Sequence, residues 1–429
     1  MRPDEPKADI SRTGSPIGAI RRATSGPRET HSFFFFLLLA YLFFEYGRPA
    51  QMLKLPMLIS ILSFGGWLVR RDKRWSPQTT LFMAFLGLMV VGIPMAANNY
   101  WAFWETYGMA VSLLCVCAPL PSLVTSVRRI KIWIYTFVAV AAYVGVWAII
   151  HRGYGPSGAD GGQDENYVAA MMGMAVSFAY FTMLTETRRA GKVLLALAIM
   201  VFCGAIVVAE NASRGGVVAL CSVILYCLVK SPRKWMALGV TALIALVVLG
   251  FAGPQFWDEM STITHVHEGT ADDRLELWTI GLRMFVAHPV FGIGPASFRW
   301  EVGAYQSSEQ HLKYGRDLGG TKVTHSLFVE LLSEMGLTGA VVLAALLWRT
   351  WSGLRQVQRG QIGRNTSTAD NDLFRVRRYA DAVMGSILAC LVNGIFLSLL
   401  YFTYLWLLLA LAGAIMQVFR AQVTAKQPV

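Results

Sequence analysis

The sequence predicts an all-α, polytopic membrane protein with about 12 transmembrane helices and one large periplasmic loop that contains amphipathic helices. Hydrophobic residues make up 55% of the 429 residues and charged residues only 15%, too few to cover a soluble protein of this length. Apolar runs of roughly 20 residues, the length that crosses the hydrocarbon core as a helix, recur along the chain. They lack the alternation of membrane-spanning strands, so helices are expected to satisfy the backbone.

Twelve apolar segments are expected to span the membrane, nine before a long polar segment and three after it. They lie at residues 32–47, 51–69, 79–97, 101–124, 130–151, 166–185, 192–209, 214–230, 234–253, 325–349, 380–397 and 400–419. The chain is therefore divided into five parts: a disordered cytoplasmic tail (1–31), a first group of nine helices (32–253), a large periplasmic loop (254–324), a second group of three helices with a cytoplasmic loop at 350–379 (325–419), and a short cytoplasmic tail (420–429).

The basic residues occur in alternate connections between the expected spans. The clusters lie at residues 70–74, 128–131, 188–192, 230–234 and 355–378. With twelve spans, every cluster falls on the side of the N-terminal tail, which the positive-inside rule makes cytoplasmic. This pattern predicts a multi-pass protein of the bacterial inner membrane with both termini in the cytoplasm. It also assigns the net charge of +12 to topology and membrane lipids, so no nucleic-acid partner is expected.

The segment 254–324 is too long to be a simple connection and is expected to face the periplasm. Within it, residues 272–287 form an amphipathic pattern that places Leu275, Trp278, Leu282 and Phe285 on one face. Such a helix is suited to the membrane interface.

The first candidate site residue is Arg214, which lies between Ser213 and Gly215 at the outer end of the eighth span. A guanidinium beside small residues with an accessible backbone suits a phosphate or pyrophosphate. The alternative is an interfacial arginine that contacts lipid headgroups. Arg274 at the start of the loop helix, with Arg283 on a later turn, could contribute a second positive charge, or both could be solvated charges paired with nearby acids.

His325 opens the tenth span. The 25 residues from His325 to Arg349 would extend about 37 Å as a helix, so His325 is expected at the outer interface. An imidazole there could act as a general base near neutral pH, or it could simply cap the helix. Glu330 and Glu334 follow on the same helix, and carboxylates within a span mark function or a polar pairing.

Metal and cofactor sites are not expected. All six cysteines lie inside apolar segments, which indicates neither a disulfide framework nor a zinc cluster. His265 and His267 form an H-x-H pair without further ligands at metal-site spacing. The Gly292-Ile293-Gly294 run lacks the strand and helix context of a nucleotide loop.

Three motifs in order resemble those of the O-antigen ligase family, over roughly residues 200–350. Ser213-Arg-Gly215 resembles the first signature; Arg274-x-x-x-Trp followed by H-P-x-x-G-x-G at 288–294 resembles the second. The run from His325 to Gly336 is similar to the family's His-containing helix. Many ligases have Asn after this His, whereas Ser326 resembles the exosortase-associated branch, so lipid A-core is less favoured as the acceptor.

The resemblance implies glycan transfer from undecaprenyl pyrophosphate to an acceptor hydroxyl at the periplasmic face, in surface polysaccharide biosynthesis. It implies inverting, metal-independent chemistry without a cofactor: Arg214 and Arg274 would bind the pyrophosphate and His325 would act as general base, with Ser213, Gly215, Arg283, Glu330 and Glu334 as possible supporting residues. The acceptor would be a lipid, a protein or a growing polysaccharide. The alternatives are a polysaccharide polymerase, a transporter or flippase of lipid-linked glycan, and a non-catalytic subunit of an export system. Transporters usually bind substrate near mid-bilayer between repeated halves, and no repeat is visible here.

Overall fold

The computed structural model describes residues 32–48, 54–156, 164–208, 213–261, 270–310, 322–360 and 368–424, and no strand occurs in these ranges. The helices follow in the order α2 (Ser32–Leu42), η1 (Phe43–Gly47), α3 (Leu55–Val69), α4 (Pro77–Gly92), η3 (Ile93–Met95), α5 (Asn99–Ala110), η4 (Val111–Cys117), α6 (Leu120–Leu123), α7 (Val127–Ile150), α8 (Glu165–Thr185), α9 (Arg189–Val207), α10 (Arg214–Lys230), α11 (Lys234–Phe251), α12 (Pro254–Ser261), α13 (Thr270–Ala287), α14 (Phe298–Tyr305), α16 (Leu327–Arg359), α17 (Thr368–Asn393) and α18 (Thr403–Thr424). The all-α prediction is confirmed for this part of the chain. The predicted tail 1–31 and the pair His265 and His267 lie outside the described residues.

Eight of the described helical segments are long and apolar enough to cross a membrane. They begin at Pro77, Asn99, Val127, Glu165, Arg189, Lys234, Leu327 and Thr403, and each coincides with an expected span. The number twelve is not confirmed. Two expected spans form shorter apolar helices at Phe33–Gly47 and Leu55–Val69. The other two are α10, which has 17 residues, and α17, whose first half is rich in charges.

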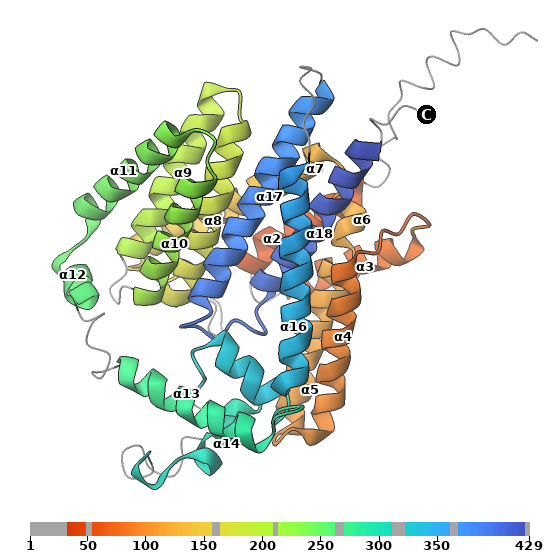
Figure 1. The fold of residues 1–429 in the computed structure, drawn as a ribbon, viewed down its shortest axis with the longest axis vertical. Coiled ribbons are helices and arrows are strands. Elements are labelled where there is room, and N and C mark those ends of the chain that lie inside the picture. The colour runs from red at the N-terminus through yellow and green to blue at the C-terminus, as the bar shows by residue number, and fades with distance from the viewer. Residues whose placement is uncertain are drawn as a thin grey trace, which may run out of the picture.

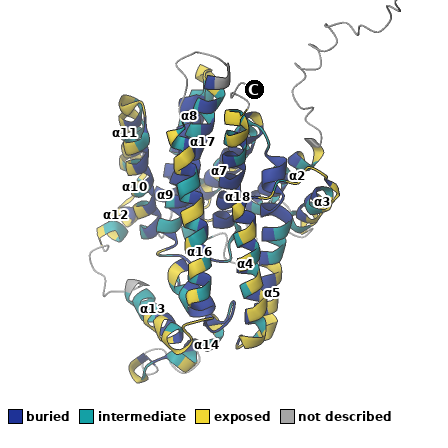
Figure 2. Cartoon of the chain, turned by 45° about the vertical axis from the view of Figure 1, so that its right-hand side comes forward, coloured by how far each residue is buried: buried dark blue, intermediate teal, exposed yellow. Residues whose placement is uncertain are grey.

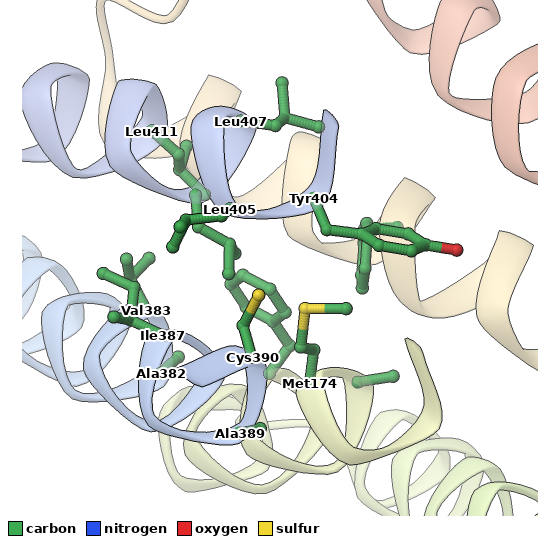
Figure 3. Packing of buried hydrophobic residues seen from close by; sticks show 14 of the residues in the cluster. Met174, Ala382, Val383, Ile387, Ala389, Cys390, Tyr404, Leu405, Leu407 and Leu411 are labelled. Carbon is green, nitrogen blue, oxygen red and sulfur yellow. The ribbon is translucent and has the colours of Figure 1, made fainter. Parts of the chain in front are cut away.

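The centre of the bundle is α8, in which every residue from Tyr167 to Thr185 is buried. It packs against α7, α9, α10 and α17, while α11 and α5 lie outside and expose many side chains (Figure 2). Met174 of α8, Cys390 of α17 and Leu405 of α18 belong to one buried cluster (Figure 3). Hydroxyls join these helices: Ser386 Oγ donates to the Met174 carbonyl at 2.8 Å. Small residues and such hydrogen bonds are what hold helices together in lipid, where burial alone gives little gain.

Helices α12, α13 and α14 lie at one end of the bundle, away from the end where the chain terminates (Figure 1). The amphipathic helix expected at 272–287 is present as α13, but its buried face differs from the predicted one. Leu282 is 46% exposed, whereas a neighbouring stripe packs inward: Leu277, Ile280 and Met284. This stripe contacts apolar residues of the following turn and of α14, and that tertiary contact, rather than the hydrophobic pattern, selects the face.

Two helices continue into the segment 350–379, which the sequence analysis treated as a connection. α16 extends to Arg359, and α17 begins at Thr368. α16 also contains a kink at Gly336, whose φ of 60° and ψ of −160° are not helical. The kink divides α16 into a short first part that begins beside His325 and a long second part.

Candidate functional site

The ends of several helices meet at the end of the bundle where α12, α13 and α14 lie, which we call the loop end. α8, α10, α16 and α18 all begin there, after Asp164, Ser213, Ser326 and Phe402 respectively. Helix N-termini carry unpaired N–H groups and the positive end of the helix dipole, which favours anions. The N–H groups at the start of α10 can therefore interact with an anion beside Arg214.

Arg214 is the first residue of α10, and the residues beside it explain why the chain turns there. The Ser213 hydroxyl caps the helix by accepting a hydrogen bond from the Gly216 N–H at 3.0 Å. Gly215 faces Phe396, where an added Cβ would lie 3.0 Å from that side chain. Ser213 and Gly215 thus have structural reasons for their identity, since they let the α10 terminus pack closely and present Arg214.

Arg274 on α13 lies close enough to Arg214 for the two positive charges to interact. Burial lowers the pKa of Arg274, and the charge of Arg214 lowers it further, while Asp164 and Glu259 act in the opposite direction. Glu259 of α12 also pairs with Arg214, with 3.4 Å between the Nε and Oε2 atoms. The structure therefore brings together the two arginines that the sequence proposed as a pair, between two carboxylates.

His325 adopts a left-handed backbone conformation, with a φ of 47°. Such a conformation is uncommon for a residue with a side chain and persists only where the surroundings enforce it. Both neighbours are held: the Thr324 carbonyl accepts a hydrogen bond from Trp278 Nε1 at 3.0 Å, and the Thr324 hydroxyl lies 2.9 Å from that of Ser398. Ser326 caps α16 on the other side. The backbone at His325 is thus held on both sides by its neighbours.

The imidazole of His325 is partly buried near positive charges. Burial, Arg274 and Lys322, in that order, lower the pKa of His325 to about 4. The ring is therefore neutral at pH 7 and can accept a proton. The same interaction places Arg274 within electrostatic range of His325, so Arg214, Arg274 and His325 form a continuous series along the loop end.

The Pro/Gly turn at 288–294 docks onto the kink of α16. Two backbone hydrogen bonds, at 2.9 and 3.0 Å, run from the turn to the carbonyls of Ser333 and Glu334. Gly292 and Gly336 both have positive φ values, 70° and 60°, and a Cβ added to Gly336 would lie 2.6 Å from the Gly292 nitrogen. Glycine at both positions allows the backbone of the turn to contact the backbone of α16. This contact gives Gly292 a structural role, and no nucleotide-binding role is needed to explain it.

The buried side chain of Glu334 holds this turn in place through hydrogen bonds. Its Oε2 accepts hydrogen bonds from the Ala296 N–H at 2.8 Å and from the Tyr401 hydroxyl at 2.5 Å, and its Oε1 accepts one from the Phe298 N–H at 2.9 Å. Ala296 has a positive φ of 52°, so the carboxylate also holds a strained residue in place. The carboxylate thus joins the loop to α16 and to the α17–α18 connection.

Two proposed supporting residues point elsewhere. Arg283 donates to the Tyr305 carbonyl at 3.1 Å and to Gln310 Oε1 at 2.9 Å, which ties α13 to the end of α14. Glu330 accepts a hydrogen bond from the Leu400 N–H at 3.2 Å. Neither side chain has a described contact with Arg214, Arg274 or His325.

Comparison with known families agrees with this geometry. Residues 199–344 match the family model described as O-antigen ligase. This stretch of the chain is therefore similar to O-antigen ligases. The match begins within α9 and ends within α16, and it includes the two arginines and the histidine described above. No curated protein matches the chain. The family supports a membrane enzyme that transfers glycans in the manner of O-antigen ligases or polymerases.

Two carboxylates near Arg274, those of Asp164 and Glu259, were not among the residues predicted from the sequence. Asp164 caps α8 by accepting hydrogen bonds from the Asn166 and Tyr167 N–H groups, and burial raises its pKa although Arg274 acts in the opposite direction. Glu259 belongs to α12, for which no helix was expected. Asp164 could have been identified as a candidate from the sequence, because it is an acidic residue that follows a glycine-rich stretch and directly precedes an expected span. Nothing in the local sequence distinguished Glu259.

Among the described residues, no group of three or more His, Cys, Asp and Glu side chains is arranged to hold a metal ion. The positive charges that lower the pKa of His325 are those of Arg274 and Lys322.

Proposed function

We propose that this protein transfers a glycan from undecaprenyl pyrophosphate to an acceptor hydroxyl at the periplasmic face of the bacterial inner membrane. The observation that carries the proposal is the position of Arg274, which is within electrostatic range both of Arg214, the first residue of α10, and of the neutral imidazole of His325. The periplasmic assignment rests on the basic clusters, which fall at the opposite ends of the same helices.

The pyrophosphate of the donor would lie between Arg214 and Arg274. An anion there removes the repulsion between the two guanidinium groups and is further favoured by the N-terminus of α10. Glu259, which pairs with Arg214 at 3.4 Å, would be displaced as the phosphate groups enter. Guanidinium groups bind phosphate oxygens through two parallel hydrogen bonds, so the site would also orient the leaving group.

His325 would act as the general base. The acceptor oxygen forms a bond with the anomeric carbon while its proton moves to the imidazole, and the bond from that carbon to the pyrophosphate oxygen breaks with inversion. The electron pair stays on the departing pyrophosphate, where the arginines stabilise the added negative charge. The imidazolium that results is next to this anion, which offsets the unfavourable neighbourhood of Arg274. The protein side chains thus supply the charge compensation, and the proposal requires no metal.

Transfer from undecaprenyl-pyrophosphoryl glycan by purified protein tests this proposal. His325→Ala should abolish transfer and retain donor binding, whereas Arg214→Ala should weaken donor binding. Arg283→Ala is the matched control, because this arginine lies on the same loop and contacts α14 instead. Undiminished transfer by His325→Ala would refute the general-base role. Single-unit products indicate a ligase, long ladders a polymerase, and donor movement across the bilayer without transfer a flippase.

A further inference from the structure

A second polar pocket lies at the other end of the bundle from His325. It has a volume of about 400 Å³ and is formed by the N-terminus of α4, the second half of α16 and the end of α18. Arg349 in this pocket is 13 positions after the kink at Gly336, about 20 Å along the second part of α16. The pocket is therefore separate from the site described above and lies at the end that carries the basic clusters.

The residues that line this pocket include positively charged side chains and no negatively charged ones. Arg349 and Arg420 both line it, and none of its lining residues is an Asp or Glu. The first turn of α4, which begins at Pro77, adds N–H groups and the positive end of a helix dipole. This combination favours a phosphate group.

A buried side chain gives independent evidence that the pocket takes a ligand. Gln78 lines the pocket and is only 1% exposed. Its Nε2 donates to the Thr350 hydroxyl at 3.4 Å, but its Oε1 has no hydrogen-bond partner. Gln417 of α18, which is partly buried, also has an unpaired amide oxygen: its Nε2 donates to the Trp75 carbonyl at 3.3 Å and its Oε1 has no partner among the described residues. Buried acceptors are usually satisfied by protein groups or by bound molecules, so these two amide oxygens can accept hydrogen bonds from a ligand with donor groups.

The surface beside the pocket is suited to a lipid. Trp348 lines the pocket and is 74% exposed, and Val341, two helical turns earlier on α16, is 58% exposed. These residues lie within a helix that can cross a membrane, so an acyl chain can follow them from the pocket into the bilayer.

We propose that this pocket binds the headgroup of an anionic glycerophospholipid of the phosphatidylglycerol type. The phosphate would interact with Arg349 and Arg420, and the glycerol hydroxyls would donate to the unpaired oxygens of Gln78 and Gln417. A zwitterionic ethanolamine headgroup fits less well, because its ammonium group would meet two arginines and no carboxylate. The pocket would thereby bind one specific lipid at the end opposite the glycan-transfer site.

Native mass spectrometry of the purified full-length protein tests the proposal. Phosphatidylglycerol, phosphatidylethanolamine and soluble glycerol 3-phosphate would be titrated separately, and the variants would be Arg349→Gln, Arg420→Gln and the double variant. Arg355→Gln is the matched control: it is an exposed arginine on the same helix that does not line the pocket and instead contacts the Trp351 ring. Helicity and monodispersity of each variant would confirm that it is folded.

The expected result is one tightly bound phosphatidylglycerol, weakened on the order of tenfold by each single substitution and unaffected by Arg355→Gln. Gln78→Leu, which removes the unpaired acceptor, should reduce the preference for phosphatidylglycerol over phosphatidylethanolamine. Equal binding of both lipids by the wild type, or equal losses in Arg355→Gln and the pocket variants, would overturn the proposal. Binding of glycerol 3-phosphate as tight as that of the lipid would identify a soluble phosphate as the ligand and overturn the lipid assignment.

Discussion

Replacing Glu334 by Gln should loosen the turn that packs beneath the candidate site. The carboxylate accepts three hydrogen bonds, from two backbone N–H groups and the Tyr401 hydroxyl, at distances of 2.5 to 2.9 Å. Glutamine keeps one acceptor oxygen and presents an NH₂ group where the other oxygen was. Whichever way the amide turns, this NH₂ faces the N–H of Ala296 or of Phe298, so at least one buried donor loses its partner.

The cost can be worked out from these contacts. Loss of one hydrogen bond to this buried carboxyl group, with a buried donor left unpaired, costs about 2–4 kcal/mol. Because Ala296 has a φ of 52°, the weakened turn can also relax out of a strained conformation. The effect should therefore appear first as local opening of residues 288–298 rather than as global unfolding.

Amide hydrogen exchange measures this opening. The amides of Ala296 and Phe298 should exchange roughly 30- to 1,000-fold faster in Glu334→Gln than in the wild type. Glu330→Gln is the control, since Glu330 lies on the same helix and accepts a hydrogen bond from the Leu400 N–H, outside this turn. Unchanged exchange at both amides, or an equal increase in the control, would show that the carboxylate does not hold the turn.

Two further outcomes follow from the surroundings of His325. Arg274→Gln should raise the pKa of His325 from about 4 toward 6.5, because one of the positive charges that lower it is removed. Since the folded pKa lies below the unfolded one, the unfolded chain binds more protons between these values; stability should increase with pH across this window, and less so in the variant. An imidazole NMR titration of donor-free protein that moves by less than a few tenths of a unit would contradict this. Trp278→Phe should lower the transfer rate about tenfold, because the loss of one hydrogen bond frees Thr324 beside the histidine. Trp300→Phe is its control, since that indole N–H has no partner to lose, and similar losses in both variants would refute the positioning role.

Much of the fold could be predicted because lipid imposes a simple rule on the chain. Backbone groups in a bilayer must be satisfied within each segment, so length and hydropathy indicate where helices lie. The expected span at 166–185, for example, corresponds to α8 at Glu165–Thr185. The rule fails where a helix leaves the bilayer or is shielded by others. α17 continues through the charged residues before Tyr379, where Arg378 pairs with Asp381 at 2.9 Å, a contact that hydropathy does not register.

By itself, the sequence determined the helical class, the order of the motifs and the candidate residues Arg214, Arg274 and His325. The tertiary structure decided which of these residues meet and what the remaining motif positions do. Arg274 was predicted to bind the pyrophosphate and Arg283, on the same helix, to support it; in the structure Arg274 lies within electrostatic range of His325, whereas Arg283 contacts the end of α14. Glu334 was predicted as a possible supporting residue of the site. In the structure its carboxylate accepts a hydrogen bond from Phe298, 36 residues earlier in the chain, and holds the turn at 288–298 in place. The physical reason is that charges and hydrogen bonds act through space, and the distances that control them are set by packing between segments remote in sequence.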